Sequence, residues 1–277
     1  MNYITIVLDL SHSRNNSARH TGYLKSNELW YGELYGLSQY EINFGKSIEL
    51  TIPNKKLRLG LLVEQFIFAS LRENKNIELL KTNLQIVQNK KTLGELDCLI
   101  LDKGKPIHLE LVYKFYLYDP SIPGNEIDKW IGPNRNDSLK QKLAKLKTKQ
   151  MPLLSHPKTN EILNDFGYNS EVFDQKVHFK AQLFLPLGQS EQIIHEVNTA
   201  CICGFYITRQ ELASFKQNEF FLPAKLDWLN DPHSDVLWLS HSQCLAVIEI
   251  ELNQFRSPLC WMKDSKGKMT KLFVVFW

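Results

Sequence analysis

The sequence has few features of a secreted, membrane-anchored or repetitive protein. Its 277 residues include five cysteines, an odd number, and no two of them are spaced as Cys-x-x-Cys. No apolar run approaches the ~18 residues that a transmembrane helix needs, and the N-terminus does not have the pattern of a signal peptide. We therefore expect reduced thiols, no membrane partner and a cytoplasmic location.

The sequence also has no strong excess of charge of either sign. The formal net charge is +3 at neutral pH. That value is too small to demand a polyanionic partner, but it does not exclude one, because a local patch matters more than the sum. No low-complexity tract interrupts the chain, and a chain of this length can form one large core with appendages.

The most informative segment is a predicted β-hairpin that contains acidic residues. Residues 94–101 and 107–116 are rich in β-branched, aliphatic and aromatic residues and flank a glycine-containing turn. Asp97 lies in the first strand, and Glu110 and Lys114 share one face of the second, since side chains alternate along a strand. One face of the hairpin therefore gathers two or three carboxylates and a lysine. Mg²⁺ binds through one or two carboxylates plus phosphate oxygens, so this grouping suits phosphodiester hydrolysis.

A solvated strand face or a structural ion pair is the alternative interpretation. Charged residues on a strand usually face water, and Glu110 could simply pair with Lys114. The other face of this strand is apolar, which is typical of a central strand covered on both sides. A carboxylate and an ammonium near a covered sheet are costly unless they are paired or metal-bound. The pattern favours a metal site, and structural pairing stays open.

These residues carry a resemblance to a known superfamily. The order Asp97, Glu110, Lys114 resembles the signature of PD-(D/E)XK nucleases, in which an Asp on one strand and a Glu and a Lys on the next hold the metal and the attacking water. Within that superfamily, residues 94–97, 109–117 and 132–134 are similar to a bacterial family of unknown function, DUF1853. The resemblance spans roughly residues 57–190.

The sequence departs from the common pattern at the lysine. One residue usually separates Glu from Lys, whereas here Val112 occupies the usual lysine position and Lys114 lies one pleat further along. That displacement is about 6 to 7 Å, which the long lysine stem can partly recover. Two functions follow: a metal-dependent nuclease, or an inactive nuclease-fold protein that binds nucleic acid or acts as a scaffold.

The resemblance implies an α/β (α+β) fold with a restriction-endonuclease-like core, in which helices flank a mixed central sheet. We expect this core at 57–190, an N-terminal extension at 1–56 and a β-rich C-terminal region at 191–277, with β-rich additions at both ends. The patterns predict, in order, a helix at 57–72, a strand at 83–88, the hairpin, a helix at 138–151 and a strand at 177–186. In the additions they predict strands at 3–8, 204–208 and 244–252 and hairpins at 42–52 and 260–276.

The resemblance also implies roles for the site residues. Asp97 and Glu110 would bind Mg²⁺ or Mn²⁺, together with a main-chain carbonyl near Leu111, and Lys114 would orient or activate water. Many superfamily members carry a helical Glu before the hairpin that faces the metals, and Glu64 matches it by position. An ordinary polar stripe on that helix is the alternative for Glu64.

Candidate contacts to nucleic acid lie in the predicted second helix and in the loop before it. The loop, residues 118–137, is longer than the ~12 to 15 residues beyond which an unstructured connection is usually functional or disordered. The candidates are Lys140, Gln141 and Gln150 on the helix and Trp130 and Arg135 in the loop. Trp130 could stack on a base or pin the loop to the core, and Arg135 could bind a phosphate. The helix lysines could equally form a solvated face.

We therefore expect a metal-dependent nuclease acting on nucleic acid, with DNA as the favoured polymer. A homodimer is compatible with the resemblance, because many nucleases of this type cut duplexes as dimers. Four tryptophans, Trp228, Trp238, Trp261 and Trp277, concentrate in the C-terminal region. An aromatic-rich module could grip a single strand, although packing is the commoner use of tryptophan.

Overall fold

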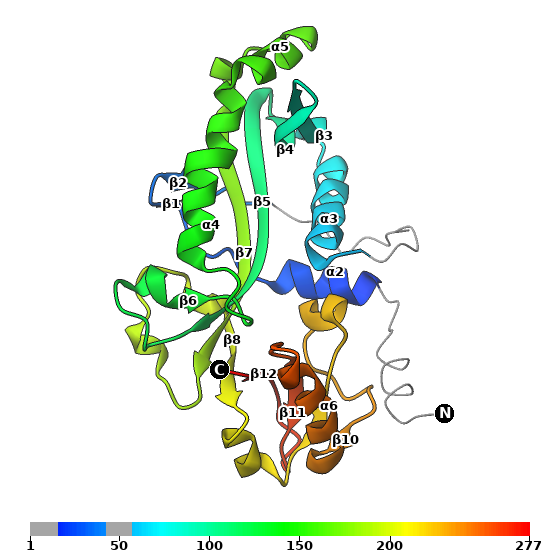
Figure 1. The fold of residues 1–277 in the computed structure, drawn as a ribbon. Coiled ribbons are helices and arrows are strands. Elements are labelled where there is room, and N and C mark those ends of the chain that lie inside the picture. The colour runs from blue at the N-terminus through cyan, green and yellow to red at the C-terminus, as the bar shows by residue number, and fades with distance from the viewer. Residues whose placement is uncertain (1–15, 43–56) are drawn as a thin grey trace.

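The computed structural model describes residues 16–42 and 57–277, and the ribbon of Figure 1 follows the chain through them. The strand predicted at 3–8 lies outside the described residues, and the hairpin predicted at 42–52 lies outside them beyond its first residue. The described part of the N-terminal extension consists of helix α2 (Asn16–Lys25) and the two-stranded pair β1 (Glu33–Leu34) and β2 (Leu37–Ser38). This part is therefore not the β-rich addition that we predicted. The helix depends on tertiary packing, since Arg19, Gly22 and Tyr23 bury one face at helical spacing.

The predicted elements at 57–190 are present in the predicted order. They are α3 (Leu59–Glu73), β3 (Ile77–Gln88), β4 (Lys91–Asp102), β5 (Lys105–Tyr118), α4 (Leu139–Lys145) and β7 (Asp174–Pro186). Shorter elements join them: η1 (Glu126–Lys129), β6 (Trp130–Ile131), a π-helical turn η2 (Leu146–Gln150), η3 (Met151–Ser155), α5 (Pro157–Asp165) and η4 (Ser170–Val172). The second predicted helix therefore continues from α4 through η2 and η3 without a break in chain direction.

The residues after β7 add strands to the same sheet. They form η5 (Glu191–Ile193), η6 (Thr199–Cys201), β8 (Ile202–Thr208), η7 (Glu211–Phe215), β9 (Glu219–Phe221), η8 (Lys225–Leu229), β10 (Leu239–Ser240), α6 (His241–Asn253), β11 (Leu259–Lys263) and β12 (Met269–Val275). The strand predicted at 204–208 and the hairpin predicted at 260–276 are confirmed as β8 and as the antiparallel pair of β11 and β12.

The strand predicted at 244–252 is wrong, because this segment is helix α6. The alternation of Val247, Glu249 and Glu251 with isoleucines and leucine is typical of a strand, but a helical signal outweighs it. A capping box between Ser240 and Gln243 starts the helix, and Cys244, Ile248 and Leu252 recur every four residues on its buried face. The described part of the C-terminal region is thus a mixture of short strands and helices.

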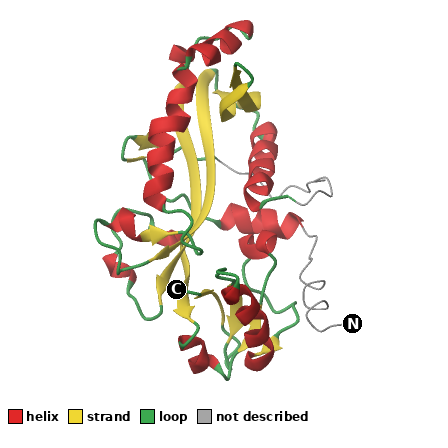
Figure 2. Ribbon diagram, in the orientation of Figure 1, coloured by secondary structure: helices red, strands yellow, loops and turns green. Residues whose placement is uncertain are grey.

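One mixed sheet organises the molecule. Its strand order is β10-β9-β11-β12-β8-β7-β5-β4-β3, and β6 pairs with β5. The contacts of β7 with β5 and β8, and of β8 with β12, are parallel. The remaining pairs are antiparallel. The molecule is therefore a mixed α+β fold with helices flanking a large mixed sheet, as Figure 2 shows.

The two faces of β5 belong to different cores. Leu111, Tyr113 and Phe115 pack with the apolar residues of α3, whereas Val112 and Tyr116 pack with the leucines of α4. Figure 1 shows α3 and α4 on opposite sides of β5. The prediction of a central strand covered on both sides is confirmed. Among the helices of the described ranges, none is long and apolar enough to span a bilayer.

Candidate active site

The candidate site lies where strands β4 and β5 separate. Their antiparallel register runs from Asp102 and Lys105 at the turn to Cys98 and Leu109, and in the described chain it goes no further. The remainder of β4 stays paired with β3. On the edge of β5 that faces away from β7, the next strand contact is β6 at Leu117. The sheet therefore forks beside residues 110–116, where this edge of β5 has no strand partner in the described chain.

Asp97 bridges the fork. Its Oδ2 accepts a hydrogen bond from the main-chain N–H of Leu111 at 2.9 Å, in place of a ladder bond between the strands. Burial raises the pKa of Asp97 to about 8, and the neighbouring charges of Glu110 and Glu64 act in the same direction. The Leu111 N–H and the ammonium of Lys142 oppose this rise only in part. Asp97 is thus a partly buried carboxyl whose negative charge has too little compensation.

Glu110 is fully buried, with 0% exposure, at the base of the fork. Its Oε1 lies 3.1 Å from His108 Nε2, and its Oε2 accepts a hydrogen bond from Gln150 Nε2. His108 in turn contacts Gln175, so Glu110 is held from both the strand and the helix side. The structural ion pair between Glu110 and Lys114, the alternative left open above, is not formed.

Lys142 of α4 is the lysine that lies near the two carboxylates. Its Nζ donates to Gln150 Oε1 at 2.9 Å, and Gln150 also holds Glu110. Burial lowers the pKa of Lys142 to about 8, while the charges of Glu110 and Asp97 oppose that change. The strand and helix patterns of the sequence did not assign Lys142 to the site. A signal was present, because Lys142 precedes buried Leu146 by four residues and so borders the apolar stripe of the helix.

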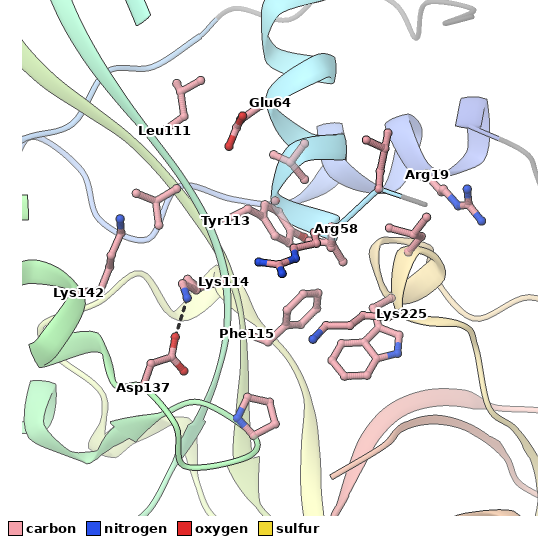
Figure 3. Close-up of a pocket in the computed structure, with 18 of the residues that line it drawn as sticks. Arg19, Arg58, Glu64, Leu111, Tyr113, Lys114, Phe115, Asp137, Lys142 and Lys225 are labelled. Carbon is pink, nitrogen blue, oxygen red and sulfur yellow. Dashed lines mark hydrogen bonds and ion pairs between the residues drawn. The ribbon is translucent and has the colours of Figure 1, made fainter. Parts of the chain in front are cut away.

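Lys114, the lysine predicted for catalysis, has a different partner. Its Nζ pairs with Asp137 Oδ2 at 2.5 Å, and the two side chains are 36% and 41% exposed. Both residues line a cleft that opens beside the fork, as Figure 3 shows. Lys114 thus lies within the candidate site, held by a carboxylate of the loop before α4 and not by Glu110.

Glu64 of α3 approaches the acidic residues from the other side of the sheet. Burial raises the pKa of Glu64, and the charges of Glu95 and Glu110 add to the rise, whereas a hydrogen bond from Asn83 opposes it. Glu64 lines the cleft, and in Figure 3 its carboxylate points into it. The helical glutamate and the acids of the hairpin therefore influence each other electrostatically.

A cleft of about 970 Å³ opens beside the fork. It is lined by the start of α3, by residues 111–115 of β5, by the loop before α4 and by residues 224–226 and Trp228. Asp97 and Glu110 do not line it themselves. The cleft reaches their neighbours Glu64, Leu111 and Lys142, so the two carboxyl groups lie just behind its wall.

The residues predicted to contact nucleic acid are dispersed. Trp130 is 0% exposed and packs edge-on against Tyr118, so it pins the loop and does not present a face for a base. Arg135 pairs with Asp119 and stacks on Trp277 with 4.0 Å from its guanidinium carbon to the ring centroid. Lys140 pairs with Asp128 at 2.6 Å outside the cleft.

The two glutamines among these candidates differ. Gln141 is exposed, and its main-chain N–H is bound by the Ser138 cap of α4. Gln150 is the one candidate of the five that joins the acidic residues, since it links Lys142 to Glu110. The helix thus contributes to the site through one lysine and one glutamine.

The residues of the fork can offer a divalent cation two side-chain carboxylates. Within residues 16–42 and 57–277, no group of three His, Cys, Asp or Glu side chains is arranged to hold a metal ion. Mg²⁺ commonly uses one or two carboxylates and completes its shell with water and substrate oxygens. Asp97 and Glu110 have that chemistry, and their mutual repulsion is what a bound cation would relieve.

Comparison with known proteins gives one match. The family model described as "Domain of unknown function (DUF1853)" covers residues 26–275. No curated protein and no solved structure matches the sequence.

Proposed function

This chain belongs to the DUF1853 family, a domain of unknown function, and on that premise we propose that it is a metal-dependent nuclease that hydrolyses phosphodiester bonds of nucleic acid. The favoured polymer is DNA. The observation that carries the proposal is the electrostatic cluster at the fork, in which Asp97 and Glu110 repel each other beside a lysine whose pKa is lowered to about 8. Structural acids are rarely left with this much uncompensated charge, and perturbed pKa values concentrate at functional sites.

The order of elements supports the proposal. A helix, three antiparallel strands, a helix and a strand is the order that resemblance to PD-(D/E)XK nucleases implies, and α3, β3, β4, β5, α4 and β7 follow it. The last of these strands, β7, is parallel to β5. Asp97 and Glu110 come from the second and third of these strands, as in that pattern. We therefore infer a restriction-endonuclease-like core for residues 57–190.

Asp97 and Glu110 would hold Mg²⁺ or Mn²⁺, with the main chain at Leu111. The N–H and C=O of a strand residue point to the same edge, so the Leu111 carbonyl faces the fork as its N–H does. A bound divalent cation would polarise the scissile phosphate and supply an activated water. Gln150 would fix the carboxylate of Glu110 relative to Lys142.

Lys142 would take the place of the motif lysine. Its neutral form is accessible near pH 8, so Nζ can accept a proton from the attacking water. Lys114, which is already paired with Asp137, would bind a substrate phosphate at the cleft wall. Glu64 would assist by holding a water that faces the cleft.

A cleavage assay tests the proposal. Wild type, Asp97→Ala and the exposed control Asp165→Ala would be incubated with labelled single-stranded, duplex and branched DNA and with RNA, in Mg²⁺, Mn²⁺ or EDTA. We expect metal-dependent products from wild type and from Asp165→Ala and none from Asp97→Ala. Binding without cleavage under all conditions would leave the alternative, an inactive nuclease-fold protein that binds nucleic acid or acts as a scaffold.

A further inference from the structure

The cleft is positively charged away from the acidic fork. Its lining includes the cations Arg19, Arg58, Lys114, Lys142 and Lys225, against the two carboxylates Glu64 and Asp137. Arg19 is bound to Asp227 and Lys114 to Asp137. The other three cations are Arg58, Lys142 and Lys225. Of these, Lys142 lies near the carboxylates of Asp97 and Glu110.

Arg58 and Lys225 face the cleft without a carboxylate. In the described chain neither makes an ion pair. They come from distant parts of the sequence, the residue before α3 and the first residue of η8, yet both line this one cleft with Phe115. Figure 3 shows the Lys225 side chain extending toward Phe115 and the guanidinium of Arg58 close to Tyr113, on the same side of the cleft. Two cations that line one cleft and form no ion pair provide a site that suits a phosphate group.

An aromatic side chain accompanies these cations. Trp228 lines the cleft and is half-buried, whereas Tyr113 and Phe115 are almost fully covered. The Trp228 ring stands edge-on to Phe115, with 5.4 Å between centroids, and the ammonium of Lys225 lies 5.5 Å from its centroid. A basic groove combined with a partly exposed aromatic ring suits an unpaired strand, whose bases are free to stack. A duplex offers phosphates to such a groove but hides its base faces.

We propose that this end of the cleft binds an unpaired strand of nucleic acid, with phosphates on Arg58 and Lys225 and a base against Trp228. The inference rests on the proposed function, because it places the strand next to the acidic fork. The proposal also assigns a role to the C-terminal region. Residues 191–277 extend the sheet and place η8 at the cleft, so two of the three strand-binding residues, Lys225 and Trp228, come from outside residues 57–190, and Arg58 comes from within them.

Binding measured in EDTA tests this proposal, because the proposed cleavage cannot occur without a divalent cation. Fluorescence anisotropy would compare labelled single-stranded DNA, single-stranded RNA and duplex DNA on wild type, Arg58→Ala, Lys225→Ala and the control Lys266→Ala, an exposed lysine in the turn between β11 and β12. We expect single strands to bind at least about tenfold more tightly than duplex, and each cleft variant to weaken single-strand binding about tenfold, the effect of one charge-assisted contact. Each lost phosphate contact should also lower the salt slope by about 0.7.

Trp228 has its own readout. A bound base should quench tryptophan fluorescence, and Trp228→Phe should remove that quench while thermal melting confirms the fold. Tighter binding of duplex, an equal loss in Lys266→Ala, an unchanged quench in Trp228→Phe, or no binding at all would overturn the inference. Single strands that bind at this surface but are never cut in Mg²⁺ or Mn²⁺ would refute the proposed function and leave the binding site standing.

Discussion

The main-chain N–H of Leu111 on β5 donates to the carboxylate of Asp97 on β4 at 2.9 Å, two residues beyond Leu109, the last residue of β5 that pairs with β4. A side chain therefore replaces the neighbouring strand at the point where the sheet opens. This contact fixes the orientation of Asp97, yet it does not offset the burial and the charge of Glu110, which raise the pKa of Asp97 to about 8. The fork thus favours the protonated, uncharged form of Asp97 up to about pH 8.

The first prediction concerns stability and pH. Because the pKa of Asp97 is about 8 in the folded protein and near its ordinary value of 3.8 in the unfolded chain, the folded state binds more protons between these limits. The free energy of unfolding should therefore fall as pH rises from about 4 to 8. Asp97→Asn should flatten this slope, as measured by urea unfolding at a series of pH values. The raised pKa of Glu64 contributes a remaining slope of the same sign.

The control for this experiment is Asp165→Asn, an exposed carboxyl on α5 that should leave the slope unchanged. The same unfolding measurements are repeated with Mg²⁺. If Asp97 is a ligand, saturating Mg²⁺ should stabilise wild type most at pH 8, where the carboxyl is otherwise most costly, and should not stabilise Asp97→Asn. Identical pH slopes in wild type and Asp97→Asn would contradict the charge assignment at the fork.

The second prediction assigns the site lysine. Lys142→Met should lower the cleavage rate by about 10² to 10⁴-fold, the usual contribution of a general base. Lys140→Met, on the same helix but paired with Asp128 outside the cleft, should cleave at close to the wild-type rate. The wild-type rate should rise with pH to a plateau above about 8, as Lys142 loses its proton. Full activity of Lys142→Met would show that another group accepts the proton.

The third prediction separates Lys114 from Lys142. Lys114 is more than a third exposed and is held by Asp137, so Lys114→Ala removes a phosphate contact and a surface ion pair worth about 0 to 1 kcal/mol. If Lys114 binds a substrate phosphate as proposed, we expect the Michaelis constant to rise with a turnover number within about tenfold of wild type. A loss in turnover as large as that of Lys142→Met would restore Lys114 as the catalytic lysine.

The contrast between these lysines shows what the sequence alone could predict. Alternation along two strands was sufficient to bring Asp97 and Glu110 together, since the face of a strand residue follows from its position. Helical spacing places Lys142 beside the apolar stripe of its helix, but its position near Asp97 and Glu110 depends on how α4 packs across β5, which is a tertiary contact. The position of Trp228 was harder still to predict from the sequence, because its place in the cleft requires the strands after β7 to continue the sheet.

The misassigned segments have a related cause. Alternating Ile and Glu in residues 244–252 favour a strand locally, and the capping box at Ser240 with a four-residue apolar repeat decides for a helix. The two signals conflict over nine residues, and long-range packing settles the outcome. By contrast, the hairpin of β4 and β5 was predictable because turn chemistry, strand propensity and burial agree over its whole length.

The fourth prediction concerns Trp130. Its side chain is fully buried among the residues that join the loop before α4 to β5, so Trp130→Ala should cost about 3 to 5 kcal/mol of folding free energy. Trp130→Phe keeps most of the packing and should bind single strands as wild type does, because the ring is not accessible. Chemical denaturation and anisotropy measure the two effects. Near-normal stability of Trp130→Ala, or a clear loss of binding in Trp130→Phe, would favour the base-stacking role instead.

The last prediction links the N-terminal helix to the strand-binding end of the cleft. Gly22 of α2 lies against η8 so closely that an added Cβ would come within 2.7 Å of the Leu229 carbonyl carbon. Gly22→Ala must therefore push η8 away. The helix propensity gained, about 1 kcal/mol, does not cover the ~1 to 3 kcal/mol that such overpacking costs. We expect a lower melting temperature and weaker single-strand binding, since Lys225 and Trp228 are carried by η8.

Gly60→Ala is the matched control for stability. Gly60 lies in the first turn of α3, and no atom lies within 4 Å of the position that its Cβ would take, so alanine should leave the melting temperature unchanged or raise it. If the displacement of η8 is what matters, Gly22→Ala should lose single-strand affinity at a temperature where circular dichroism shows it fully folded. A Gly22→Ala protein that melts lower but binds single strands normally would mean that the cleft does not depend on the contact between α2 and η8.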